Sequence, residues 1–406
     1  MERIDALARI TEEPGRITRT FCSPAMRGAN DLVRAWMQEA GMTVREDPIG
    51  NLIGRYGGSS QAGLKIEEKT FLLGSHLDTV RDAGRFDGML GVLVAIACVQ
   101  KLREKKTKLP FTLEVAGFAD EEGVRYHSTY LGSKVLAGTF DQELLKRADA
   151  KGITMAEAIR NFGGEPDRIA SEARDPRQLL GYAEVHIEQG PVLEQKNLAV
   201  GVVTAISGQT RIKAGFTGMA GHAGTVPMVL RHDALCAAAE FVLAVESLAQ
   251  SRGGLVATVG ELAPLPGASN VIPGEARLSV DVRHPDDARR AAACAELQAR
   301  AQRIAKERNV GTGWQVVHES DAVICDRNLT LLLSEAVKRR QGEFPLMASG
   351  AGHDAAAMAV ITPVTMLFVR CKNGISHHPE ESVLVEDVRV AIDVLSDFVD
   401  HLAQSK

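Results

Sequence analysis

The sequence is poor in aromatic residues and in cysteine, and it has neither a surplus of basic residues nor a long apolar run. Aromatic residues make up 4% of the 406 residues, so the core should be mostly aliphatic. The six cysteines are scattered without a CxxC pair, which argues against a disulfide framework and against a thiolate zinc site. The formal net charge of -5 argues against a nucleic-acid surface, which needs clustered Lys and Arg.

A membrane span and a secretory leader are not expected either. The first residues, MERIDALARITEEPGRI, carry charges where a signal peptide needs an apolar run. The longest apolar run, Met89 to Val99, is too short to cross a bilayer. We therefore expect a cytoplasmic protein with buried free thiols and with no nucleic-acid or membrane partner.

The length of the chain predicts two domains, because 406 residues exceed the usual size of one hydrophobic core. The first half alternates apolar strands with a helix, which predicts a mostly parallel sheet covered by helices. The expected elements are strands 51–57, 70–76 and 111–119 and helix 88–103. We expect the charged segment 146–177 to be a helical excursion over the surface.

From about residue 208 the predicted strands and helices follow the order β-α-β-β-α-β, which is the ferredoxin-like pattern. Its expected helices are 228–250 and 285–307, and its strands are 210–218, 255–263, 276–284 and 314–320. The α/β pattern returns with helix 328–341, strand 363–371 and helix 384–403. We therefore predict an α/β domain formed by residues 1–207 and 321–406, with an inserted α+β domain, residues 208–320.

Histidine and carboxylate side chains, which can bind metal ions or transfer protons, lie where predicted strands end. His76 and Asp78 follow the strand TFLLGSH, at the edge where open α/β sheets bind their ligands. Asp78 can orient His76, since a metal-bound histidine usually donates its second ring N–H to a carboxylate. Asp87 precedes a predicted helix and, taken alone, fits a helix N-cap better than a metal ligand.

The next strand delivers Asp120, Glu121 and Glu122, which alone could simply face solvent. GYAEVHIEQG places His186 on a strand, and NGISHHPEE carries a histidine pair, His377 and His378. Together these segments predict a metal centre at the sheet edge. Nitrogen and carboxylate ligands without thiolate suit Zn, Mn or Co, and their number suggests two ions that share a carboxylate.

Nine motifs in a fixed order resemble the hydantoinase/carbamoylase branch of the dimetal amidohydrolases, relatives of the aminoacylases and dipeptidases. Members of that branch include allantoate amidohydrolase, N-carbamoyl-L-amino-acid hydrolase, ureidoglycolate amidohydrolase and β-ureidopropionase. The resemblance extends from FCSPA at 21 to HHPEE at 381. The motifs are GSHLDTV with RFDG, ADEEGVRY, HIEQGP, GHAGTVPM, NVIPG, DVRH, SGAGHDA and GISHHPEE.

The resemblance implies a role for each matching residue. His76 and His186 would hold one divalent ion, Zn or Mn, and Glu122 and His377 the other. Asp87 would bridge the two ions, with His378 as the alternative to His377. Glu121 would be the general base, and Asp78 would support the ligands.

The resemblance also implies the residues that bind the substrate. Without the resemblance, Arg283 on the outward face of a predicted strand would be interpreted as a solvated arginine. His222 would likewise be interpreted as a histidine in a surface loop. In the family pattern His222 is the lid histidine that stabilises the oxyanion. The positions that match substrate-binding residues are Arg211, Asn270, Arg283, Gln189 and Gly352, the last within a loop, residues 350–353, that matches positions near the substrate.

The function that the resemblance implies is metal-dependent hydrolysis of a linear ureido or carbamoyl C–N bond. The substrate would be a small ureido carboxylic acid, allantoate or an N-carbamoyl-L-amino acid, and ammonia and carbon dioxide would be released. The alternatives are a dipeptidase or aminoacylase on the same dimetal scaffold, and a non-catalytic metal-dependent binding protein, for which Glu121 would have no use. The resemblance further implies a homodimer through the inserted lid domain, with the lid histidine reaching the neighbouring site.

Overall fold

The computed structural model describes residues 1–57 and 69–405, which form two compact units. The first unit comprises Met1–Thr204, Cys325–Met347 and Gly352–Lys406, and the second comprises Ala205–Ile324 with Ala348–Ala351. The short stretch 348–351, which the sequence assigned to the first domain, groups with the second unit. Backbone hydrogen bonding accounts for this, since the Ser207 N–H donates to the carbonyl of Ser349 at 2.9 Å.

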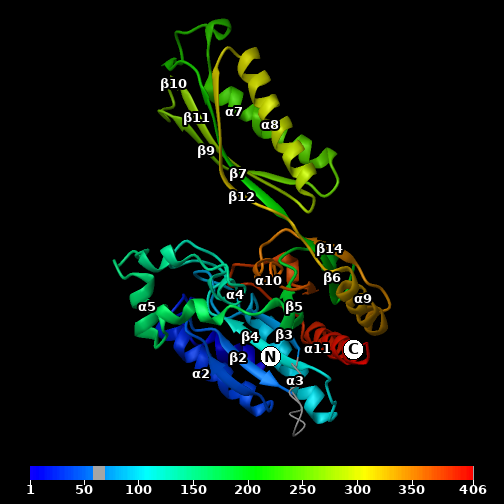
Figure 1. The fold of residues 1–406 in the computed structure, drawn as a ribbon. Coiled ribbons are helices and arrows are strands. Elements are labelled where there is room, and N and C mark those ends of the chain that lie inside the picture. The colour runs from blue at the N-terminus through cyan, green and yellow to red at the C-terminus, as the bar shows by residue number, and fades with distance from the viewer. Residues whose placement is uncertain (58–68, 406) are drawn as a thin grey trace. The chain divides into compact units, whose positions relative to one another are not determined.

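The larger sheet has nine strands among the described residues, in the order β1-β2-β4-β3-β5-β15-β6-β13, with β14 paired to β6 (Figure 1). The strands are β1 (Thr43–Glu46), β2 (Leu52–Tyr56), β3 (Thr70–His76), β4 (Thr112–Phe118), β5 (Leu179–Ile187), β6 (Val200–Ile206), β13 (Val323–Ile324), β14 (Leu346–Ser349) and β15 (Val364–Val369).

This sheet is mixed, which corrects the prediction of a mostly parallel one. The four central strands β4, β3, β5 and β15 are parallel. The flanking pairs β1-β2, β2-β4, β15-β6 and β6-β13 are antiparallel. The sequence pattern detects only the central strands as parallel, because those are buried on both faces and read as continuous apolar runs.

Three long helices cover the central strands of this sheet. Helix α3 (Met89–Glu104) is buried nearly all round, ends in Lys101 and Arg103, and packs on β3 and β5. Helix α11 (Val385–Gln404) packs against both α3 and α9 (Arg327–Gln341), and α9 and α11 contact β15. The other helices are α1 (Glu2–Ala8), α2 (Pro24–Glu39), α4 (Leu131–Leu136), α5 (Met155–Phe162), α6 (Val192–Gln195) and α10 (Asp354–Met358). The segment 146–177 holds α5 and short 3₁₀ turns, as predicted.

The second unit has the predicted β-α-β-β-α-β order. Its four-stranded antiparallel sheet runs β12-β7-β11-β9, and two helices pack on one face (Figure 1). Alternate residues of β11 are buried, so the odd-numbered arginines lie on the other face, as expected. The elements are β7 (Gly208–Thr217), β8 (Gly221–His222), α7 (Ala234–Ser251), β9 (Val256–Leu265), β10 (Val271–Ile272), β11 (Glu275–His284), α8 (Asp287–Glu307) and β12 (Gly311–Ser320).

Helix α7 begins six residues later than predicted. Asp233 caps it by accepting hydrogen bonds from the N–H groups of Leu235 and Cys236, which fixes the start. Among the described residues, α7 is the one helix long and apolar enough to cross a membrane by length and composition. Phe241 and Val245 on its buried face belong to the core of the second unit, where the helix packs on the sheet.

All six cysteines are free, as the scattered spacing predicted, but the prediction that they are buried holds only for Cys98, Cys325 and Cys371. Cys22 and Cys294 are partly buried, and Cys236 is exposed on helix α7.

Candidate metal centre and substrate groups

The carboxyl ends of the parallel strands bring together side chains that are far apart in the sequence. In the register of the sheet His76 lies opposite Phe118 at the end of β4, and His186 lies opposite Phe368 of β15. Glu121 and Glu122 follow directly after β4, so their side chains join the same edge. The sheet therefore gathers two histidines and two glutamates at one place, as the sequence predicted.

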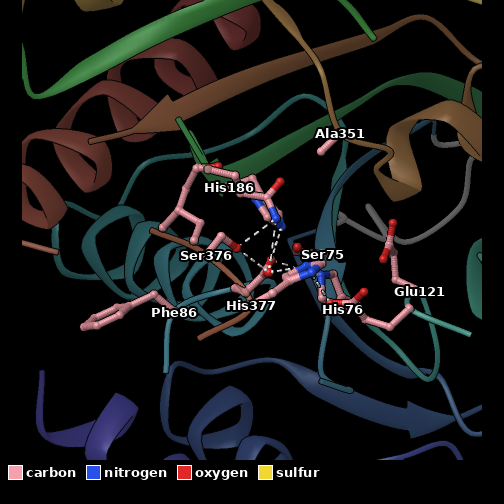
Figure 2. Close-up of polar contacts among 12 residues, drawn as sticks. Ser75, His76, Phe86, Glu121, His186, Ala351, Ser376 and His377 are labelled. Carbon is pink, nitrogen blue, oxygen red and sulfur yellow. Dashed lines mark hydrogen bonds and ion pairs between the residues drawn. The ribbon is translucent and has the colours of Figure 1, made fainter. Parts of the chain in front are cut away.

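Asp87 lies at the centre of this group and is almost fully buried. One oxygen, Oδ1, is 2.9 Å from His186 Nε2 and 3.8 Å from His76 Nε2; the other, Oδ2, is 3.0 Å from His377 Nε2. Burial alone would raise the pKa of Asp87, but the neighbouring histidines outweigh it and hold that pKa well below its ordinary value. Figure 2 shows the three imidazole rings converging with Ser376 on one point.

The N-cap interpretation of Asp87 is wrong. The cap residue of α3 is Gly88, and no side chain accepts a hydrogen bond there. Gly88 has a φ of 70°, and a Cβ at this position would lie 2.4 Å from atoms of the His76 ring. Glycine is required because the backbone passes directly beside the ring.

Asp78 orients His76 and the loop after β4 together. The Nδ1 atom of His76 lies 3.3 Å from a carboxylate oxygen of Asp78 and 3.1 Å from its carbonyl oxygen, so Nε2 faces Asp87. The same carboxylate accepts the N–H groups of Glu121 and Glu122 at 3.0 and 3.1 Å. Burial lowers the pKa of His76, but Asp78 and its neighbours reverse the effect and raise it well above its ordinary value.

The second side of the centre is formed by Glu122 and His377. Their Oε1 and Nε2 atoms are 3.3 Å apart, and both groups lie near Asp87. Hydrogen bonds to Asp87 and Glu122 raise the pKa of His377 to about 10. The geometry places His377 in the group; the Nδ1 atom of the alternative, His378, instead accepts the N–H of Glu380 at 3.2 Å.

Three sets of side chains come close enough to hold a metal ion. These sets are His76, Asp87 and His186; His76, Glu121 and Glu122; and Asp87, Glu122 and His377. Within each set the candidate ligand atoms lie within 4.8 Å of one another. The first and last sets share Asp87, which is the arrangement expected of two neighbouring sites.

Glu121 differs from its neighbour in its surroundings. It is more deeply buried than Glu122. Burial raises the pKa of Glu121 well above its ordinary value; His76 opposes this shift and Glu122 adds to it. Enzymes commonly raise the pKa of a glutamate by burial when it serves as a general acid or base.

The sequence did not predict that Ser376 and Gln189 hold Asp87, or that His353 lies beside His186. The Ser376 hydroxyl donates to Asp87 Oδ2 at 2.9 Å, and the Gln189 amide, predicted only as a substrate group, donates to the same oxygen at 3.1 Å. The His353 ring lies 4.6 Å from that of His186. Burial lowers the pKa of His353 well below its ordinary value. The resemblance placed the loop 350–353, which includes His353, near the substrate, but it did not predict the contact with His186.

Gly352 itself lies against Tyr130. A Cβ at Gly352 would fall 1.7 Å from the tyrosine hydroxyl, so no other residue fits without a shift.

In the second unit, β8 and β10 bring His222 and Asn270 together. His222 lies opposite Val271, and the Ala223 N–H donates to the carbonyl of Asn270 at 3.0 Å. The His222 Nδ1 atom accepts the N–H of Gly224 at 3.0 Å. Because Nδ1 is an acceptor, the proton of the neutral ring lies on Nε2, which is then a donor.

Arg211 and Arg283 also lie together, but with a partner that the sequence did not predict. Arg211 pairs with Asp281 across β7 and β11, and its Nε lies 3.3 Å from an Asp281 oxygen. Arg283 Nη1 donates to the carbonyl of Gly350 at 2.7 Å. Burial would raise the pKa of Asp281, but the two guanidinium groups lower it below its ordinary value.

Residues 72–401 match peptidase family M20/M25/M40. The chain belongs to this family. Allantoate deiminase 1 of Glycine max is 40% identical over 99% of this chain and 88% of its own length. The N-carbamoyl-L-amino acid amidohydrolase of Geobacillus stearothermophilus is 39% identical over 100% of this chain and 98% of its own length. The amidase of the hydantoinase/carbamoylase family from Burkholderia multivorans superposes with a TM-score of 0.91, at 33% identity, over 98% of this chain and 95% of that structure.

The resemblance predicted from nine motifs is therefore confirmed, and this member of the family is a hydrolase. Its donor set agrees with the chemistry that a divalent metal requires. Imidazole nitrogens and carboxylate oxygens converge from five segments of the chain, and thiolate is absent from the sets of described residues that could hold an ion.

Proposed function

We propose that this protein hydrolyses a linear ureido C–N bond in a small carboxylic acid, with allantoate ahead of an N-carbamoyl-L-amino acid as substrate. The observation that carries the proposal is the position of Asp87 between one pair of candidate ligands, His76 and His186, and a second pair, Glu122 and His377. The curated relatives with similar chains are named for ureido substrates, which favours this bond over a peptide bond.

The proposed cofactors are two divalent ions, zinc or manganese, with His76 and His186 at one ion, Glu122 and His377 at the other, and Asp87 shared. When bound, such ions would supply Lewis acidity toward the scissile carbonyl and toward a water molecule. Asp78 contacts His76, and Ser376 and Gln189 donate hydrogen bonds to Asp87. Outer partners of this kind fix the orientation of a ligand and its basicity.

Glu121 is the proposed general base. It takes a proton from the attacking water and returns it to the leaving nitrogen, and its raised pKa suits both transfers. The loop that carries Glu121 is held by Asp78, which also orients His76. Proton transfer and ligand geometry are therefore linked through one buried carboxylate.

The second unit supplies the proposed groups for the substrate's charges. Arg211 and Arg283 would bind the carboxylate, since guanidinium groups match carboxylates in geometry and charge. Asn270, Gln189 and Gly352 are further proposed contacts. His222, with its proton on Nε2, would donate a hydrogen bond to the oxyanion.

We also propose a homodimer through residues 208–320, because closed two-fold dimers are the commonest assembly and the edge strands β9 and β12 carry exposed apolar side chains. Light scattering at micromolar concentration tests this assembly. A fully active monomer would contradict it.

The experiment that tests the function is ammonia release by protein that has been stripped of metal and reloaded with Mn²⁺ or Zn²⁺. The substrates are allantoate, ureidoglycolate, several N-carbamoyl-L-amino acids and a dipeptide. We expect metal-dependent turnover of one ureido acid. Cleavage of the dipeptide with no ammonia from any ureido acid would overturn the proposal.

A further inference from the structure

We propose that Glu381 is a positioning residue, which ties the backbone at Asp87 to the loop that carries His377. Its Oε1 atom accepts the N–H groups of Phe86 and Asp87 at 2.6 and 3.0 Å. These are contacts between segments almost 300 residues apart in the sequence. The inference rests on the proposed function in one respect, since it takes Asp87 as the ligand shared by two ions.

Glu381 belongs to the same turn as His377. The Glu381 N–H donates to the carbonyl of His378 at 3.0 Å, and the Lys372 N–H donates to that of Ser382 at 2.8 Å, which closes the loop. His377 in turn reaches Asp87 Oδ2 at 3.0 Å. The loop therefore contacts Asp87 twice, at its backbone through Glu381 and at its carboxylate through His377.

The segment before Asp87 packs closely against the carboxylate of Glu381. A Cβ at Gly84 would lie 2.3 Å from the Cβ and Cδ atoms of Glu381, so the side chain packs directly on the glycine backbone. The Phe86 ring is 1% exposed and points away from the metal ligands (Figure 2), which anchors the segment on its other side. The backbone at Asp87 is thus held between a core anchor and Glu381.

The second carboxylate oxygen of Glu381, Oε2, is buried and has no hydrogen-bond partner in the described part of the chain. A buried polar atom without a partner lowers stability. If Glu381 only filled space, a side chain without this second oxygen would therefore stabilise the fold more. The two interactions that remain are those of Oε1, and both end at Asp87 or its neighbour. Glu381 therefore acts as an acceptor that sets the direction of Asp87, whose two oxygens face His186 and His377 respectively.

The test compares Glu381→Gln, which keeps an acceptor oxygen, with Glu381→Leu, which keeps only the size. Glu380→Leu, at the exposed neighbouring position, is the control. Gly84→Ala, which should displace the carboxylate, is a second route to the same defect. Mn²⁺ is the probe. Calorimetric titration gives its affinity and stoichiometry, and electron paramagnetic resonance separates a spin-coupled pair of ions from isolated ions.

We expect Glu381→Gln and Glu380→Leu to bind two Mn²⁺ ions as a coupled pair. Glu381→Leu and Gly84→Ala should bind the second ion at least about tenfold more weakly and lose the coupled signal, since outer partners contribute about 10- to 100-fold to metal affinity. A coupled pair of normal affinity in both defective variants would overturn the inference. So would a glutamine variant as impaired as the leucine variant, because the charge rather than the acceptor would then matter.

Failure of this inference and failure of the proposed function can be told apart. If the unaltered protein binds a coupled Mn²⁺ pair but releases no ammonia from any ureido acid, the function fails while the role of Glu381 is still tested by the four variants. If the unaltered protein hydrolyses a ureido acid with one ion bound, the function stands and the inference is overturned.

Discussion

The guanidinium group of Arg283 lies side by side with the carboxylate of Asp281, with Nε 2.8 Å from one oxygen and Nη2 2.9 Å from the other. Asp281 also pairs with Arg211, so the three side chains together carry one net positive charge. One positive charge matches one substrate carboxylate. The pairing also restricts the rotation of both arginines before a substrate arrives, which reduces the entropy lost on binding.

Replacement of Arg283 by alanine should raise KM for carboxylate substrates. The loss of a charge-assisted pair costs roughly 1.5 to 3 kcal/mol, or about 10- to 150-fold. Steady-state kinetics with a ureido acid and with its carboxamide analogue measure the effect, which should be small for the analogue. Arg277→Ala, on the same face of β11, is the matched control. An equal loss on both substrates would reject the carboxylate role.

Replacement of Glu121 by glutamine should lower kcat by about a hundredfold to ten-thousandfold, the usual range for a general base. Metal content should be unchanged, because the proposed ligand is Glu122. Turnover and metal analysis by mass spectrometry on the same sample check both statements. A variant that loses an ion together with activity would make Glu121 a ligand, as the set formed by His76, Glu121 and Glu122 also allows.

Gly88→Ala should remove bound metal, because the new Cβ would collide with the ring of His76. Gly15→Ala is a matched control, since Gly15 has a φ of 79° and a Cβ there meets no atom within 4 Å. Both variants incur backbone strain of about 1 to 2 kcal/mol, but only one disturbs a proposed ligand. Metal content after dialysis should therefore separate them. Equal metal content would show that the His76 ring can move aside.

Bound metal should stabilise the fold, and the free energy of unfolding should rise with the logarithm of the free metal concentration above Kd. At a free Mn²⁺ concentration one hundred times Kd, one site adds about 2.7 kcal/mol to the free energy of unfolding. Urea unfolding at several Mn²⁺ concentrations measures this increase. Ca²⁺, which prefers six to eight oxygen ligands, is the control and should add little. Equal stabilisation by both ions would point to binding outside the histidine centre.

Arg19→Met should destabilise the first unit strongly. The Arg19 guanidinium is buried and donates to the carbonyls of Leu77, Leu7 and Ile10 at 2.7, 3.1 and 3.0 Å. Methionine removes these three hydrogen bonds of a buried guanidinium group, at a cost of about 3 kcal/mol or more. Denaturant unfolding gives the value. Arg289→Met, at a side chain with 73% exposure and one ion pair at 3.8 Å, should change it by less than about 0.5 kcal/mol.

Much of the fold could be predicted from the sequence because its central elements carry strong periodic signals. Helix α3 and strand β3 fall within one residue of their expected bounds, since they are apolar throughout and end in charged or polar residues. The start of α7 could not be predicted in this way. Apolar residues extend the helical pattern back to Met228, where the structure has a short 3₁₀ turn, and Asp233 decides the boundary through side-chain hydrogen bonds.

Part of the candidate site could also be predicted from the sequence, and part of it could not. His76, Glu122 and His186 could be placed together because parallel strands end at a common edge. The contacts of Asp281 with two arginines and of Glu381 with Asp87 depend on side-chain rotamers and on loops that no period describes. The contact of Glu381 with Asp87 joins residues nearly 300 positions apart in the sequence, so it can be recognised only in the folded structure.

The position of β15 between β5 and β6 has a consequence for the synthesis of the chain. Both neighbours are complete by Ile206, but β15 begins only at Val364, so the middle of the sheet stays open while the ribosome adds the intervening residues. At about 5 to 20 residues per second this takes roughly 8 to 30 seconds. During that time two apolar strands expose unpaired edges, which are prone to aggregation. A chaperone that covers apolar strands would be needed most between the emergence of β6 and that of β15.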